Sequence, residues 1–128
     1  MKYLVTGGAG FIGSNFIHYM LRTHRDIAIV CLDKLTYAAD LDNLSGAEDS
    51  GRFLFVKGDI CDKAAVESLF LREKFDAVVN FAAETHVDRS ISDPSPFIRS
   101  NIAGVQVLLE CCTVHGVRFH QVSTDEVY

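Results

Sequence analysis

The chain has 128 residues, of which 48% are hydrophobic and 23% charged, a composition ordinary for a single globular domain. Its formal net charge of -5 argues against a surface that follows nucleic-acid phosphates. Glycines interrupt the first apolar residues too early for a secretory signal, and no apolar run is long enough to span a bilayer. We therefore expect a cytoplasmic protein with no nucleic-acid or membrane partner.

Short β-rich runs alternate with amphipathic segments in the first half of the chain. Lys2–Thr6 predicts a strand, and apolar residues between Phe11 and Leu21 recur at helical spacing. Ala28–Leu32 is a continuous apolar run, typical of a strand buried on both faces. The polar stretch 36–51 has room for a short helix at about 39–44.

The alternation continues with a third strand and a second helix. Phe53–Val56 predicts the strand, and Asp62 is expected to cap the helix that follows. The inner face of this helix should carry Val66, Leu69 and Phe70.

The last third contains the remaining elements. Ala77–Phe81 predicts a fourth strand, and the polar stretch 82–96, which holds both prolines, predicts a long loop. A helix with Gly116 as its C-terminal stop and a strand at Phe119–Ser123 should follow. We expect the inner face of that helix to carry Ile102, Val105, Leu109 and Cys112.

This order of elements predicts an α/β fold with a Rossmann-like, doubly wound parallel sheet of about five strands in the order 3-2-1-4-5. Residues 1–128 would form one domain. A buried-type fifth strand is a poor sheet edge, so we expect the domain to be incomplete and more chain to follow.

The four cysteines, Cys31, Cys61, Cys111 and Cys112, lack the spacing of a zinc site or a redox pair. We interpret them as small hydrophobic residues in a reducing compartment, and we expect no metal.

The turn after the first strand reads TGGAGFIGS from Thr6, and its glycines fit G-x-G-x-x-G from Gly8 and G-x-x-G-x-x-G from Gly7. Glycines allow a tight turn, close approach of a pyrophosphate, and close packing of helix and strand. The N-terminus of the following helix offers free N–H groups and a positive dipole end. This pattern predicts a dinucleotide site that includes Gly7, Gly10 and Gly13.

An acidic residue about 20 positions further on supports the prediction. Asp33 lies 20 residues after Gly13, directly after the second strand, where a carboxylate can bind ribose hydroxyls. It would repel a 2′-phosphate, so NAD is favoured over NADP, although Lys34 weakens that preference slightly. Asp59 ends the third strand and is, taken alone, as compatible with a turn or helix cap as with a ligand contact.

Three further motifs carry a family resemblance: DKLTYAADLDNL from Asp33, FAAETHVDRSI from Phe81 and STDEVY from Ser123. With the glycine turn, they resemble the extended short-chain dehydrogenase/reductases that modify nucleotide sugars, and within that group the dTDP-glucose 4,6-dehydratases. The resemblance covers the whole chain. It implies a lyase of deoxysugar biosynthesis that uses NAD and dTDP-glucose and is a homodimer.

The resemblance also implies roles for individual residues. Phe11 and Ile12 match contacts of the phosphate turn, and Asp59 and Ile60 match residues that meet the adenine. The expected contacts with the adenosine ribose are Asp33, Lys34, Leu35 and Thr36. The expected contacts near the nicotinamide half are Phe81, Ala82, Ala83, Glu84 and Thr85, with Ser100 as a further cofactor contact.

The substrate is expected to meet Thr85, Ser90 and Thr124. Ser90 lies in a polar loop with Asp88 and Arg89, and a structural ion pair between these two is at least as compatible with the pattern as substrate contact.

Thr124, Asp125 and Glu126 are the expected catalytic residues. The resemblance implies hydride transfer from sugar C4 to NAD, elimination of water across C5 and C6, and return of hydride to C6. Two close carboxyl groups in a desolvated pocket take opposite protonation states, as such an elimination needs. By analogy, Asp125 is the acid and Glu126 the base; the alternative is a solvated acidic turn.

The Tyr-x-x-x-Lys pair that these relatives use to oxidise C4 does not occur in the 128 residues. We therefore expect the N-terminal part of a longer enzyme, without its C-terminal sugar-nucleotide domain and inactive by itself. The alternatives are another extended nucleotide-sugar enzyme, such as an epimerase or decarboxylase, a non-catalytic NAD-binding module, or a truncation product that cannot fold.

Overall fold

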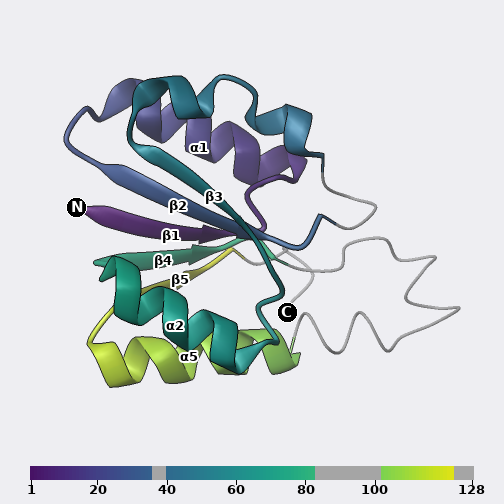
Figure 1. Ribbon diagram of the computed structural model, residues 1–128, viewed down its shortest axis with the longest axis vertical. Coiled ribbons are helices and arrows are strands. Elements are labelled where there is room, and N and C mark those ends of the chain that lie inside the picture. Colours follow the sequence, from purple (N-terminus) through teal and green to yellow (C-terminus); the bar gives the residue numbers. More distant parts are fainter. Residues whose placement is uncertain (36–39, 83–101, 123–128) are drawn as a thin grey trace, which may run out of the picture.

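The computed structural model describes residues 1–35, 40–82 and 102–122, which form a parallel sheet between two helical layers (Figure 1). The strands are β1 (Lys2–Thr6), β2 (Ala28–Asp33), β3 (Phe53–Lys57), β4 (Ala77–Asn80) and β5 (Arg118–Gln121). Their order in the sheet is β3-β2-β1-β4-β5, and every neighbouring pair is parallel. The predicted fold class and strand order are confirmed.

The helices divide between the two faces of the sheet. Helix α1 (Phe11–Thr23) lies on one face with the short 3₁₀ helices η1 (Leu41–Leu44) and η2 (Ala47–Ser50) (Figure 1). Helices α2 (Lys63–Glu73) and α5 (Gly104–His115) pack side by side on the other (Figure 1). Each layer covers its own apolar cluster, and the central strands β1 and β2 contribute side chains to both. The described part of the chain has no helix long and apolar enough to cross a membrane.

Two predicted helix ends are confirmed. Asp62 caps α2, because its carboxylate accepts a hydrogen bond from the N–H of Ala65 at 3.2 Å. Gly116 ends α5 in the left-handed region, with φ at 66°. The inner face of α2 carries Val66, Leu69 and Phe70, as expected.

The predicted inner face of α5 is wrong in most of its residues. The buried residues of the helix are Gly104, Leu108, Cys111 and Cys112, so only Cys112 was placed correctly. Ile102 and Leu109 are instead 64% and 44% exposed. Apolar residues surround this helix on more than one face, so helical spacing alone could not select the side that packs. Close packing at Gly104 selects it: a Cβ there would collide with the side chain of Ile60.

The last strand lies close to where we expect it, but its predicted burial is wrong. We expected a buried strand at Phe119–Ser123, but β5 covers Arg118–Gln121 and is the edge of the described sheet. Only Phe119 is partly buried in it. The polar side chains Arg118, His120 and Gln121 are exposed in the described part of the chain.

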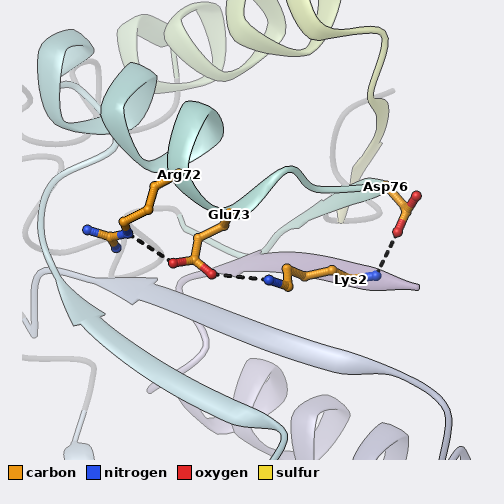
Figure 2. Close-up of polar contacts among 4 residues, drawn as sticks. All are labelled: Lys2, Arg72, Glu73 and Asp76. Atoms are coloured by element: carbon orange, nitrogen blue, oxygen red, sulfur yellow. Dashed lines mark hydrogen bonds and ion pairs between the residues drawn. The ribbon is translucent and has the colours of Figure 1, made fainter.

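Polar contacts join the N-terminal ends of β1 and β4 to the end of α2 (Figure 2). Lys2 donates through Nζ to Glu73 at 3.2 Å and through its backbone N–H to Asp76 at 2.7 Å. The hydrogen bond from Arg72, at 2.9 Å, lowers the pKa of Glu73, and the contact with Lys2 acts in the same direction. This cluster lies at the opposite end of the strands from the glycine turn, so we assign it a structural role.

Candidate functional site

The expected cofactor residues meet at the carboxyl ends of β1, β2 and β4. In a parallel sheet these ends share one edge, where doubly wound folds bind ligands. The glycine turn follows β1 and leads into α1. Gly7 has φ of +71°, and a Cβ on it would lie 2.5 Å from the backbone nitrogen of Ala82. A Cβ on Gly13 would lie 2.5 Å from the carbonyl oxygen of Gly7. The sequence motif therefore reflects close packing of backbone on backbone.

The start of α1 is open to a ligand. Gly10 is the N-cap residue, and no side chain in the described chain caps this end of the helix. The side chains of Phe11 and Ile12 are 75% and 65% exposed. N–H groups of a first helical turn have no partner within the helix, and the dipole there is positive. An anion such as a pyrophosphate fits this end.

Asp33 is buried beside the turn, with 8% of its surface exposed. Its Oδ2 accepts a hydrogen bond from the N–H of Ala9 at 2.9 Å, and its Oδ1 accepts one from Leu35 at 2.8 Å. A carboxylate offers about four acceptor positions, so each oxygen keeps capacity for another donor, such as a ribose hydroxyl. The left-handed backbone at Leu35, with φ of 58°, directs the chain back toward Asp33.

Lys34 and Asp59 lie at the ends of the neighbouring strands β2 and β3. The ammonium of Lys34 is 3.9 Å from a carboxylate oxygen of Asp59. Asp59 also accepts a hydrogen bond from the N–H of Cys61 at 2.9 Å. This contact forms a turn, which is one of the roles that the sequence allows for Asp59. Ile60 is 5% exposed and packs into the core below α5, so a ligand would reach its backbone before its side chain.

A buried polar network that we did not predict lies next to the turn. Asn80 is completely buried at the end of β4; its Oδ1 accepts hydrogen bonds from the hydroxyl of Thr6 at 2.5 Å and the N–H of Ala82 at 3.0 Å. Its Nδ2 donates to Gln121 of β5 at 2.8 Å. The network ties three strands together at the edge where the site lies. The side-chain partners of Asn80, Thr6 and Gln121, are 74 and 41 residues away, so local sequence patterns carry no signal for these contacts.

The cysteines contribute packing and a backbone contact at the site: the thiol of Cys31 lies against Gly8, and the N–H of Cys61 donates to Asp59. Cys31, Cys111 and Cys112 are buried, Cys61 is half-buried, and none of the four forms a disulfide. Burial, reinforced by the charge of Asp33, raises the pKa of Cys31 to about 12. Burial raises the pKa of Cys112 to about 11. Within residues 1–35, 40–82 and 102–122, no three His, Cys, Asp or Glu side chains lie close enough to hold a metal ion.

Several expected site residues lie outside the described residues. They are Thr36, Ala83, Glu84, Thr85, Asp88, Arg89, Ser90, Ser100, Thr124, Asp125 and Glu126. Their assignments, and those of the described cofactor residues, stay predictions.

Comparison with known proteins shows where the chain belongs. It is 52% identical over 128 residues to the dTDP-glucose 4,6-dehydratase of Mycolicibacterium smegmatis, a match that covers all of this chain and 38% of the relative. A crystal structure of dTDP-glucose 4,6-dehydratase from Streptomyces venezuelae with NAD bound superimposes with a TM-score of 0.92 at 46% identity, covering 100% of this chain and 41% of that one.

A UDP-glucose 4-epimerase from Stenotrophomonas maltophila with bound NAD also superimposes, with a TM-score of 0.88 at 32% identity over 100% of this chain and 38% of that one. This chain thus spans about two fifths of the length of these relatives. The family model for GDP-mannose 4,6-dehydratase matches residues 4–128. The chain therefore belongs to the GDP-mannose 4,6-dehydratase family of nucleotide-sugar enzymes.

Proposed function

We propose that this chain supplies the NAD-binding part of a dTDP-glucose 4,6-dehydratase, a cytoplasmic enzyme that forms dTDP-4-keto-6-deoxyglucose. The observation that carries the cofactor assignment is the arrangement of Asp33 and the open N-terminus of α1 on either side of the glycine turn. The carboxylate of Asp33 suits ribose hydroxyls, and the N-terminus of α1 suits a pyrophosphate. The substrate assignment rests on the 52% identity to a dTDP-glucose 4,6-dehydratase, against 32% to an epimerase of similar fold.

The geometry of Asp33 also supports NAD over NADP. Its carboxylate is fixed by two backbone N–H groups and would lie against a 2′-phosphate. The ammonium of Lys34, which could neutralise such a phosphate, lies 3.9 Å from Asp59 instead. Titration of the chain with NAD⁺ and NADP⁺ in a calorimeter tests this assignment. We expect at least tenfold tighter binding of NAD⁺; equal affinities would contradict it.

The elimination step is assigned to the chain's own carboxyl groups. NAD, when bound, would accept hydride from sugar C4 and return it to C6. With C4 oxidised, the proton on C5 is acidic, and Glu126 removes it. Asp125 donates a proton to the hydroxyl that leaves C6, so this step gives water and a C5–C6 double bond. When hydride is returned to C6, Glu126 gives its proton back to C5. Thr124 is proposed to hold the C4 hydroxyl.

The assignment of the acid predicts a separation of two steps. In a protein that joins this chain to a Tyr-x-x-x-Lys pair, Asp125→Asn should slow water loss more than C4 oxidation, because only the former needs the proton from Asp125. Single-turnover measurements of NADH formation and of product separate the steps. Equal slowing of both would contradict the assignment. With the 128-residue chain alone we expect no 4-keto product.

A second copy of the chain is the protein partner that we propose. A groove of about 1050 Å³ runs over the outer surfaces of α2 and α5. Leu71, Ile102 and Val114 contribute to it with 66%, 64% and 79% of their surfaces exposed. An apolar surface of this kind is typical of an interface.

A further inference from the structure

The peptide groups on both sides of Ala9 are held by polar groups from two later segments. Ala9 is completely buried in the centre of the glycine turn. Its N–H donates to Asp33 at 2.9 Å. Its carbonyl oxygen accepts two hydrogen bonds, from the side-chain Nδ2 of Asn43 at 2.9 Å and from the backbone N–H of Asp40 at 3.1 Å. Hydrogen bonds thus hold the turn at both the N–H and the carbonyl of Ala9. Among the described residues, Asn43 is the one whose side chain bonds this carbonyl.

Asn43 is itself held firmly in η1. Its N–H donates to the carbonyl of Asp40 at 3.0 Å, and its neighbour Leu44 is 2% exposed in the core below α1. The ring Nε2 of His18, on α1, lies 2.8 Å from the carbonyl oxygen of Asn43. A carbonyl oxygen only accepts hydrogen bonds, so this nitrogen carries the proton. The segment that carries the side-chain amide of Asn43 is therefore anchored to α1, the helix that follows the glycine turn.

We propose that Asn43 is a positioning residue for dinucleotide binding: its amide holds the carbonyl of Ala9 and so fixes the glycine turn and the first N–H groups of α1. Gly10, the N-cap of α1, directly follows Ala9, so a rotation of that peptide would move the helix start. An aspartate of the same shape cannot hold the carbonyl, because an ionised carboxylate has no donor. The inference rests on the proposed binding of NAD and extends it to a residue outside the glycine motif.

The test compares two ligands and three variants. Asn43→Asp keeps the shape and removes the donor, and Asn43→Ala removes the side chain. The control, Asp49→Asn, exchanges a carboxylate for an amide at an exposed position of η2. NAD⁺ is titrated by calorimetry. Adenosine, which has no phosphate and would depend on Asp33 and its surroundings, is titrated by NMR chemical shifts. Thermal unfolding of each variant reports the fold; Asn43 is an exposed residue, so the fold should tolerate both changes.

We expect the Kd for NAD⁺ to rise about tenfold in both Asn43 variants, with the Kd for adenosine and the affinity of the control unchanged. Unchanged NAD⁺ binding in the Asn43 variants, with normal binding by the original chain, would overturn the inference and leave the proposed function intact. A parallel loss for NAD⁺ and adenosine with a lowered Tm would also overturn it, because that is the result of a merely structural role. No NAD⁺ binding by the original chain would refute the proposed function and this inference together.

Discussion

Asn80 shows how much one buried side chain contributes to the edge of the sheet that carries the site. If Asn80→Leu replaces it, the buried hydroxyl of Thr6 and the half-buried N–H of Ala82 both lose their acceptor. We expect the free energy of unfolding to fall by about 2–4 kcal/mol, measured by urea denaturation. Gln121→Ala should cost less, about 1 kcal/mol, because Gln121 is exposed and water can take its place as the acceptor for Asn80. Similar losses for the two variants would contradict this ranking.

Cys31 should make stability depend on alkaline pH. Burial first, and then the charge of Asp33, raise its pKa from 9.0 to about 12 in the folded chain. Below pH 9 the thiol is protonated in both states, so its contribution is fully present. As the pH rises through 9, the unfolded thiol loses its proton and the folded one keeps it, so stability falls. Relative to Cys31→Ala, the original chain should lose about 1.4 kcal/mol between pH 8 and pH 10 in urea titrations. Parallel pH profiles would rule out the raised pKa.

At the scale of residues, sequence could identify groups whose role follows from local spacing. The glycines and Asp33 belong to this class, because the strand–turn–helix unit places them by itself. This class does not include Asn80, Asn43 and Arg52, whose roles do not follow from local spacing. Each bonds a partner 25 to 74 residues away, and polar residues at such positions are indistinguishable from surface residues until the chain has folded.

Among the elements, α1 depends on Arg52, the residue directly before β3. The guanidinium of Arg52 donates to the carbonyl oxygens of Leu21, His24 and Ile27 at 2.7, 2.8 and 2.9 Å, so it closes the C-terminal end of the helix. A lysine lacks this planar fork, so Arg52→Lys should cost about 1–2 kcal/mol in urea denaturation and speed amide exchange in the last turn of α1. Arg22→Lys, an exposed change in the same turn, is the control and should stay within about 0.5 kcal/mol.

Strand and helix positions could be predicted where the pattern had one solution. The bounds of β1 were predicted to the residue, and Val66, Leu69 and Phe70 mark a single apolar stripe on α2. The inner face of α5 had several solutions, and the contact of Gly104 with Ile60, which lies between β3 and α2, decides among them. The helix expected at 39–44 is a 3₁₀ turn at Leu41–Leu44, and η2 has no apolar period that could have predicted it.

The whole arrangement follows from the alternation of strands and helices, because right-handed crossovers leave few ways to order five parallel strands. That order brings the ends of β1, β2 and β4 together and assembles the cofactor side of the site from segments far apart in sequence. The outer surface of the molecule follows from no such rule. Sequence spacing assigned Ile102 and Leu109 to the core, whereas both lie at the groove over α2 and α5.

Association of two molecules through that groove is the prediction for the whole molecule. Exposed apolar side chains on α2 and α5 would be removed from water if a second copy covered them, so the 14.2 kDa chain should sediment as a dimer. Leu109→Glu places a charge in the groove and should shift the chain to a monomer in analytical ultracentrifugation. The control is Leu54→Glu on β3, where the leucine is 45% exposed against 44% for Leu109. This control should remain a dimer. A monomeric original chain at about 100 μM would contradict an interface at this groove. A dimer that survives Leu109→Glu would also contradict it, because a buried unpaired carboxylate costs several kcal/mol.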